Sequence, residues 1–424
     1  MTSQSPSDPP SPSRMRRFRR WVLAGAAVGL LAGVAAGALW YWHSQQPAQR
    51  FARALAALDA KRLDEVQREL EALEGAAGYE PQEHFLRGAL LVQAGKYYPA
   101  LEEFGHCVEN PELRVRALLL SGEALYRTGE YQNAAWLWLQ VLQSEPDAVE
   151  AHRWLAAAYY DLGLTNDAMV HLIRVAELAP ADPRPHRLMG LIQKDGENYK
   201  GAVASYRESL GRDPQQPDRE DILLELAECQ LKLRQYEAAQ ETLAQCRPSP
   251  DRWAAEAECQ YGAGRVPEAR RLLEQALAEM PAHLPALLLA GTIALEEGNA
   301  AAAVDALSRA AVAYPKDYTV RFKLALAYRR LGDNQRADEH AQAAEQIKRL
   351  REEFSKLHRK AAAEPDNADV RYRLGVMARQ LDRPDLARVW FRAVLGINPR
   401  HEEARRQLTG GPPAASPLEG MQPK

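Results

Sequence analysis

The amino-acid sequence predicts an all-α chain in which one transmembrane helix precedes an α-solenoid of antiparallel helix pairs. Three observations predict this fold class. A charge-free apolar segment lies near the N-terminus, a pattern of small residues and prolines recurs every 34 residues after it, and the 424-residue chain is 46% hydrophobic and 26% charged. This composition excludes a mainly disordered chain, and stacked repeats need no division into separate domains at this length.

Residues 1–20 are strongly basic, with five arginines and the single acid Asp8. The first thirteen are mostly serine and proline, which bury too little apolar surface to offset the entropy lost on folding. We expect a disordered basic tail in the cytoplasm. The whole chain has a formal net charge of −3. It therefore has no overall basic field, and nucleic acid is not expected as a partner.

The segment from Trp21 to Trp42 contains no charged residue. As a helix rising about 1.5 Å per residue, it is long enough to cross a hydrocarbon core of about 30 Å. Aromatic residues stand at both of its ends, where the two membrane interfaces would lie. All five arginines precede it, so the positive-inside rule keeps the N-terminus in the cytoplasm. The expected location is the cell (inner) membrane, single-pass, with the lipid bilayer around residues 21–42 and the remaining chain outside the cytoplasm.

The same segment leaves two questions open. Ala36, Gly37 and Ala38 resemble a signal-peptide cleavage site, so the alternative is a secreted or periplasmic soluble factor released by cleavage near Ala38. Glycines also recur every four residues and form a strip on which a second membrane helix could pack, although an Ala/Gly-rich composition produces such spacings by itself. The glycines are Gly25, Gly29, Gly33 and Gly37.

After the apolar segment, a small residue is followed by Ala twelve positions later and by Pro another twelve positions later. Six units match all three positions: Gly122, Ala134, Pro146; Ala156, Ala168, Pro180; Gly190, Ala202, Pro214; Ala257, Ala269, Pro281; Gly291, Ala303, Pro315; and Gly375, Ala387, Pro399. A large aromatic or aliphatic residue stands four positions after each central Ala, as Trp138 does. Small residues let two antiparallel helices approach, large residues fill the space between them, and Pro ends the second helix.

This pattern resembles the tetratricopeptide repeat (TPR) family, whose 34-residue signature is W-x2-L-G-x2-Y, then A-x3-F, then P. The resemblance implies about ten TPR-like repeats over residues 47–408, followed by a disordered tail over residues 409–424. The expected repeat starts are Pro47, Pro81, Val115, Val149, Pro183, Glu220, Pro250, Leu284, Tyr318 and Ala368.

The unit that starts at Tyr318 departs from the pattern because no proline follows until Pro365. We expect its second helix to continue over roughly residues 335–361. An apolar stripe runs along it: Ile347, Leu350, Phe354 and Leu357. Basic residues favour the solvated side: Lys348, Arg349, Arg351, Lys356 and Arg359. The stripe has two interpretations, packing against the last repeat or burial by a partner or a second copy of the chain.

No motif for catalysis, nucleotide binding or metal binding occurs in the sequence, so we expect no enzyme activity, cofactor or metal. The four cysteines include no CxxC pair: Cys107, Cys229, Cys246 and Cys259. They are either four buried thiols or include a disulfide between Cys246 and Cys259. Three histidines, His84, His152 and His186, share one position of their repeats, which favours packing over metal binding.

The resemblance also implies that the first helix of each pair lines a concave partner-binding groove with positions 2, 5, 9, 12 and 13. Eight of these residues form a basic, aromatic-edged stretch: Arg116, Tyr126, Arg127, Arg153, Tyr160, Arg184, Arg187 and Lys194. Arginine and aromatic side chains suit an acidic or extended polypeptide. The competing interpretation is that these charges only keep a long surface soluble. The predicted function is a membrane-anchored scaffold or assembly factor that mediates protein–protein interactions outside the cytoplasm, with partners of unknown identity.

Overall fold

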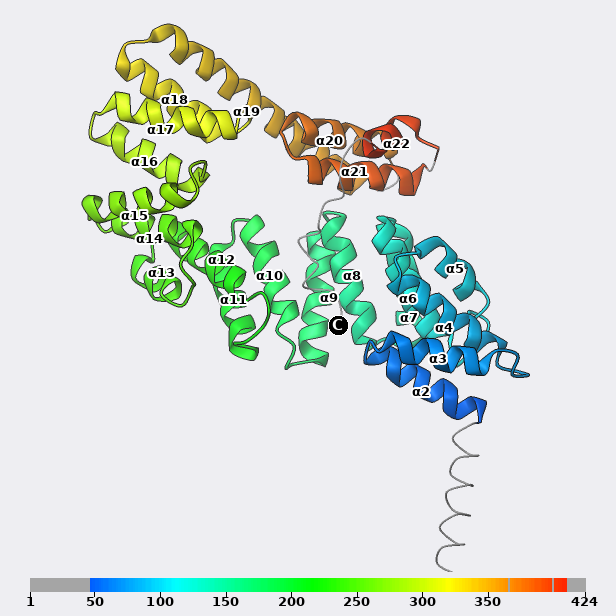
Figure 1. The fold of residues 1–424 in the computed structure, drawn as a ribbon. Helices are drawn as coiled ribbons and strands as arrows, with labels where there is room; N and C mark the ends of the chain where they lie inside the picture. The colour runs from blue at the N-terminus through cyan, green and yellow to red at the C-terminus, as the bar shows by residue number, and fades with distance from the viewer. Residues whose placement is uncertain (1–45, 365–366, 399, 410–424) are drawn as a thin grey trace, which may run out of the picture. The chain divides into compact units, whose positions relative to one another are not determined.

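The computed structural model describes residues 46–364, 367–398 and 400–409, and all regular secondary structure in these residues is helical (Figure 1). The helices are α2 (Pro47–Asp59), α3 (Leu63–Leu73), α4 (Glu80–Gln93), α5 (Tyr97–Gly105), α6 (Arg114–Thr128), α7 (Tyr131–Ser144), α8 (Val149–Asp161), α9 (Thr165–Leu178), α10 (Arg184–Asp195), α11 (Tyr199–Arg212), α12 (Arg219–Lys232), α13 (Tyr236–Leu243), α14 (Pro250–Gly262), α15 (Val266–Glu279), α16 (Leu284–Glu296), α17 (Ala300–Ala313), α18 (Tyr318–Leu331), α19 (Asn334–Ala363), α20 (Ala368–Gln380), α21 (Pro384–Ile397) and α22 (Glu402–Thr409). Consecutive helices pack against one another from α2 to α5 and from α7 to α22.

The helices from α2 to α21 form consecutive pairs, and the first helix of each pair begins within one residue of the start that the sequence pattern predicts. In addition, α14 contacts α16 and α16 contacts α18, although a second helix lies between them in the chain. The first helices of these pairs therefore share one face. All-α architecture with stacked helix pairs is thus the observed fold of the described residues.

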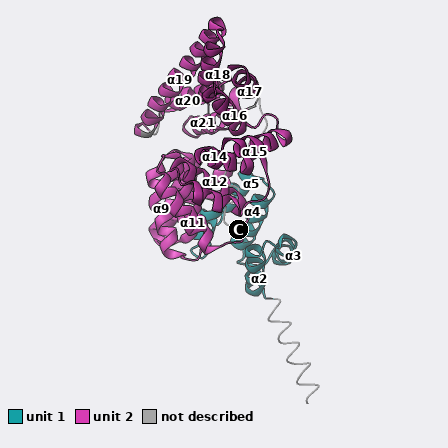
Figure 2. Cartoon of the chain, turned by 90° about the vertical axis from the view of Figure 1, so that its left-hand side faces the viewer, with its two compact units in different colours: residues 1–120 teal, residues 121–424 magenta. Residues whose placement is uncertain are grey.

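The chain divides into two compact units, residues 1–120 and 121–424, and the division falls inside α6 (Figure 2). Unit 1 contains the described helices α2 to α5 and the start of α6. Unit 2 contains the remaining helix pairs. The sequence pattern alone predicts one uninterrupted array over residues 47–408, so this division is additional information from the structure.

In five helix pairs of the described chain, a glycine of the first helix lies close against a large side chain of the second helix. A Cβ atom placed on Gly122 would lie 2.3 Å from Nε1 of Trp138, and one placed on Gly291 would lie 2.6 Å from Cγ of Leu307. Trp138 and Leu307 have 0% exposed surface. Because these contacts leave no room for a side chain, the small position and the large residue 16 positions later are two halves of one packing contact.

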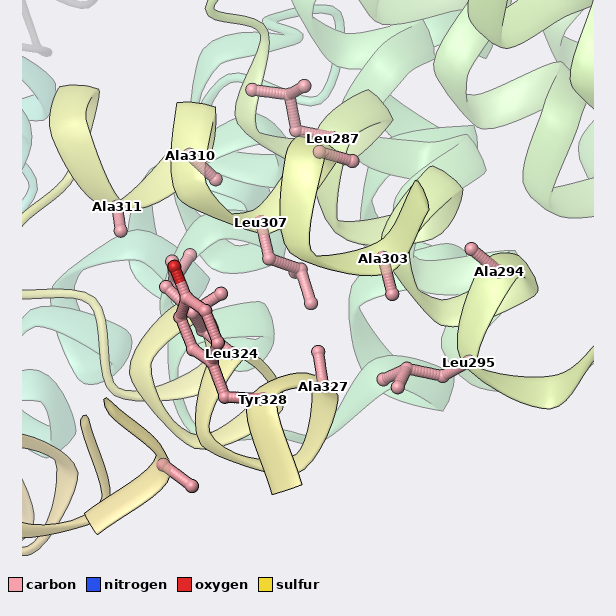
Figure 3. Packing of buried hydrophobic residues seen from close by; sticks show 13 residues of the cluster. Leu287, Ala294, Leu295, Ala303, Leu307, Ala310, Ala311, Leu324, Ala327 and Tyr328 are labelled. Atoms are coloured by element: carbon pink, nitrogen blue, oxygen red, sulfur yellow. The ribbon is translucent and has the colours of Figure 1, made fainter. Parts of the chain in front are cut away.

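The buried core of α16, α17 and α18 shows the same arrangement in detail (Figure 3). Leu307 lies among Leu287, Ala303 and Leu324, and all four are at most 1% exposed. Alanine at the crossing points brings the helices close together, while leucine fills the space that remains. Repeats of this kind are stabilised by their neighbours, because one helix pair cannot bury its own apolar faces.

The pair α18–α19 ends differently from the others. Asp317 caps α18, accepting a 2.8 Å hydrogen bond from the amide of Val320, and Gly332 ends that helix with a positive φ of 88°. No proline follows in α19, which therefore continues for 30 residues from Asn334 to Ala363. The range predicted from the sequence was 335–361.

The apolar stripe of α19 packs against the last helix pair. Leu357 belongs to the core of α20 and α21, and Leu350 and Phe354 are partly buried against that core. Ile347 is also buried, at 4% exposure. Of the two interpretations left open by the sequence, packing against the last repeat is the one that the structure supports.

Candidate functional site

The eight residues predicted to line a groove all lie on first helices, and acidic residues surround them. Arg153 of α8 and Arg184 of α10 both bind Asp182, with N–O distances of 2.8 and 2.9 Å. The side chain of Asp182 is 7% exposed. Burial alone would raise the pKa of Asp182, but hydrogen bonds from Arg184 and the two guanidinium charges hold it below its usual value.

The next contacts connect each first helix to the following one. The hydroxyl of Tyr160 donates to Asp195 of α10 over 3.1 Å, and Lys194 lies 3.5 Å from both Glu225 and Glu228 of α12. Burial raises the pKa of Tyr160, with the nearby Asp195 adding to the effect. Each basic or hydroxyl group is therefore paired with an acid one repeat further along the chain.

Arg187 completes this set by pairing with Asp218, which directly precedes α12. The Arg153–Asp182, Tyr160–Asp195, Arg187–Asp218 and Lys194–Glu225/Glu228 contacts are termed here the charge ladder. Its basic side chains are only 14–19% exposed. The ladder is therefore nearly charge-compensated, unlike the basic stretch that the sequence suggested.

Tyr126 is 5% exposed and offers little surface to a partner. Its ring packs among Tyr131, Trp138 and Trp154, and its hydroxyl donates to Asp161 over 2.5 Å. Burial is the main cause that raises the pKa of Asp161 to about 6 and that of Tyr126 well above its usual value. The role of Tyr126 in the structure is packing and hydrogen bonding between repeats.

The two remaining predicted residues also have acidic neighbours. Arg127 lies 3.2 Å from Glu123, one turn earlier in α6. Within unit 1, Arg116 lies 3.7 Å from Asp59 and is 47% exposed, the most of the predicted basic residues. The pattern of a single repeat does not reveal the ladder pairings, because each acid lies 29–35 residues beyond its basic or tyrosine partner. A search for Asp or Glu 29–35 residues after each basic or tyrosine position would have found the ladder.

The four cysteines and His152 lie in the interior. All four cysteines are free and buried, and burial raises the pKa of Cys259 to about 12. A disulfide between Cys246 and Cys259 is therefore not formed in this structure. His152 and His171 approach each other through their Nδ1 atoms at 2.8 Å. Within residues 46–364, 367–398 and 400–409, no group of three or more His, Cys, Asp or Glu side chains is placed to hold a metal ion.

The predicted membrane segment, Trp21 to Trp42, and its glycines lie outside the described residues. In the part of the chain that the structure describes, no helix combines the length and apolar character needed to cross a bilayer.

Two family models of the tetratricopeptide repeat match the sequence. One matches residues 125–192 and 195–259, and the other matches residues 85–143, 255–318, 288–349 and 335–402. Together they cover well over half of the chain. Stacked helix pairs of this kind define the class of α-solenoid repeat proteins. The chain belongs to the tetratricopeptide repeat family.

Solved structures of similar proteins are distant. A fragment of MamA from Desulfovibrio magneticus RS-1 is 20% identical, with 40% of this chain and 94% of that chain covered and a TM-score of 0.37. PilW, titled a widely conserved type IV pilus biogenesis factor, is 20% identical, with coverages of 49% and 96% and a TM-score of 0.40. YrrB, titled a TPR protein with an unusual peptide-binding site, is 14% identical, with coverages of 44% and 97% and a TM-score of 0.40. No curated protein sequence matches the chain.

Proposed function

We propose that the chain is a membrane-anchored TPR scaffold or assembly factor that binds protein partners outside the cytoplasm through the first-helix face of α8, α10 and α12. The observation that carries this proposal is the grouping of Arg153, Arg184 and Arg187 around two aspartates from neighbouring repeats. Guanidinium groups held in place by existing carboxylates lose little side-chain entropy when a partner carboxylate approaches.

Exchange of carboxylates is the proposed mode of binding. Glu150, one of the acids that pairs with Arg153, is 42% exposed, so a partner carboxylate can take its place without entering the core. Asp182 remains buried and keeps the two arginines oriented. The face thus binds an acidic or extended segment of a protein, which is a binding role rather than a catalytic one.

Anchoring rests on the sequence of residues 21–42 and on the arginines before it. Protease accessibility of the repeats in intact and permeabilised cells tests this topology. Protection from cytoplasmic protease together with retention in the membrane fraction supports the anchor. An N-terminus beginning near residue 39 supports the alternative, a soluble factor released by cleavage near Ala38. Repeats cleaved from the cytoplasmic side contradict both.

Self-association through Gly25, Gly29, Gly33 and Gly37 is tested by replacing these four glycines with leucine and measuring crosslinked dimers.

Partner capture tests the first-helix face directly. Replacing Arg153, Arg184 and Arg187 with glutamine removes three positive charges while keeping polar side chains beside the aspartates. We expect crosslinked partners identified with the native chain to be lost. The control variant changes three exposed arginines elsewhere to glutamine: Arg234, Arg271 and Arg349. It is expected to keep the crosslinked partners. Adding Asp182→Asn to the first variant removes the aspartate charge that the lost arginines leave uncompensated. If this variant is folded and still captures no partner, the loss of capture does not come from unfolding. Full capture by the folded triple variant contradicts the proposal.

A further inference from the structure

A second basic surface lies on α19, away from the charge ladder. Lys348, Arg351, Lys356 and Arg359 line an open pocket of about 440 Å³, with Tyr318 of α18 at its edge. These four residues are termed here the cationic face. All four are exposed. They are 3, 5 and 3 residues apart, so they lie on one side of the helix and span about 16 Å at 1.5 Å per residue.

The orientation of the cationic face is set by the opposite side of α19. Leu350, Phe354 and Leu357 are packed against the last helix pair. Because turning the helix would expose these apolar side chains, the cationic face is held toward solvent.

Among the described residues, no acidic side chain lies within ion-pair distance of any member of the cationic face. Neighbouring basic residues on the same helix differ: Arg349 pairs with Glu345, and Lys360 pairs with Glu364. The one acid that lines the pocket is Glu352. The pocket therefore carries four positive charges and one negative charge.

Aromatic surface continues from the edge of this pocket. The rings of Tyr318 and Phe322 are stacked, with centroids 5.9 Å apart, and Phe322 is 54% exposed. Leu326, one turn further along α18, is 37% exposed. A ligand that reaches from the cationic face onto α18 would therefore meet apolar and aromatic side chains after the basic ones.

The two ends of the chain outside the described residues do not complement this surface. Residues 1–20 carry five arginines and one acid, and residues 410–424 carry Glu419 and Lys424 as their only charged side chains. Glu352, in the middle of the basic residues, disfavours a polyphosphate, whose charges are continuous along its backbone. A polypeptide can place its carboxylates beside the basic residues and avoid Glu352.

We propose that the cationic face and the adjoining Tyr318–Phe322 pair form a docking site for an acidic segment of another protein that also carries a large apolar side chain. Carboxylates of the segment bind Lys348, Arg351, Lys356 and Arg359, and its apolar side chain packs on Phe322. The inference rests on the protein-binding role proposed above, but it places the contact on a second helix and on different residues.

The test uses the full-length chain in detergent micelles and a fluorescein-labelled peptide of repeated Glu-Glu-Phe units, with binding followed by fluorescence anisotropy. Arg351→Glu with Lys356→Glu is expected to raise Kd at least about tenfold. The matched control is Arg349→Glu with Lys360→Glu, which reverses one Arg and one Lys on the same helix outside the pocket. Its Kd is expected to stay within about twofold of the native value. Phe322→Ala is expected to weaken binding of this peptide but not of a peptide in which Ser replaces each Phe.

Four results would overturn the inference. The first is an equal loss of peptide affinity in the two double variants, and the second is equal binding of the peptide in which Ser replaces each Phe. The third is tighter binding of an oligothymidylate that is abolished in the pocket variant, Arg351→Glu with Lys356→Glu. The fourth is self-association of the chain that is abolished in the same variant. The third identifies a phosphate ligand, and the fourth identifies a second copy.

Partner capture separates this inference from the proposed function. If the Arg153/Arg184/Arg187 variant loses partners while the pocket variant binds the peptide normally, only the docking site on α19 is wrong.

Discussion

The charge ladder and the cationic face use the same kinds of residue but present different surfaces. In the ladder, Arg153 and Arg187 are 16% and 14% exposed and each binds an aspartate from a neighbouring repeat. On α19, Arg351 and Arg359 are exposed, and no acid of the described chain pairs with them. The comparison shows that the position of a basic residue on a repeat helix does not establish whether its charge is available to a partner.

The physical origin of the difference is the neighbouring repeat. In the charge ladder, stacking of consecutive pairs brings an acid of the next repeat beside the basic residue, as Glu225 of α12 is brought beside Lys194 of α10. The second half of α19 continues past the length of an ordinary repeat helix. Within the described residues, no acid pairs with the basic residues of its cationic face. An irregularity in the repeat array thus exposes unpaired charge, while regular stacking neutralises it.

The largest effect that separates the two regions is expected at Asp182. Asp182→Ala leaves Arg153 and Arg184 without their buried carboxylate, and the free energy of unfolding is expected to fall by about 2–3 kcal/mol. Glu352→Ala, on the cationic face, is expected to change it by at most about 0.5 kcal/mol. Urea denaturation followed by circular dichroism measures both variants. Equal effects would show that the ladder is no more stabilising than an exposed charge.

The repeat architecture could be predicted because its packing contacts are close in sequence. Gly122 and Trp138, or Gly375 and Phe391, are 16 residues apart and belong to a single helix pair, so one 34-residue pattern contains both partners. The length of α19 also followed from the sequence, since proline is absent where the other repeats place it.

The charge state of the candidate site could not be predicted in the same way. Whether Lys194 is free or paired depends on Glu225 and Glu228, which lie in the following repeat. The pocket on α19 depends on Tyr318, which is 30 residues before Lys348 in sequence. Contacts between repeats depend on how the pairs stack, and the pattern of a single repeat does not contain that information.

Acid is expected to weaken the paired repeats through a partly buried imidazole. Burial, together with the neighbouring His152, lowers the pKa of His171 to about 4. The unfolded chain therefore takes up this proton more readily, and stability is lost as the pH falls from about 6.5 to 4. Because the ring is partly exposed, solvent screening reduces the expected loss to about 1–2 kcal/mol. His171→Gln is expected to reduce the dependence of the urea midpoint on pH across this range. An unchanged slope would show that His171 is not responsible.

A matched pair of tyrosine substitutions compares hydrogen bonding in the two regions. Tyr160→Phe removes the 3.1 Å hydrogen bond to Asp195 and is expected to cost about 1 kcal/mol. Tyr318→Phe keeps the ring at the edge of the cationic pocket, and its hydroxyl makes no hydrogen bond within the described residues. It is expected to cost at most about 0.5 kcal/mol. Chemical denaturation measures the free energy of unfolding of both variants. A larger cost for Tyr318→Phe would contradict the assignment of the stabilising hydrogen bond to Tyr160.

The smallest effect is expected where α19 does have an ion pair. Arg329 of α18 and Asp338 of α19 are 3.0 Å apart, and their side chains are 57% and 65% exposed. A double-mutant cycle with Arg329→Ala and Asp338→Asn is expected to give a coupling energy of at most about 0.5 kcal/mol, because water and salt screen exposed pairs. A coupling above about 1 kcal/mol would mean that exposed pairs on α18 and α19 are strong. Burial of the ion pair would then not account for the larger effect expected at Asp182, whereas a weak coupling supports the assignment of that effect to burial.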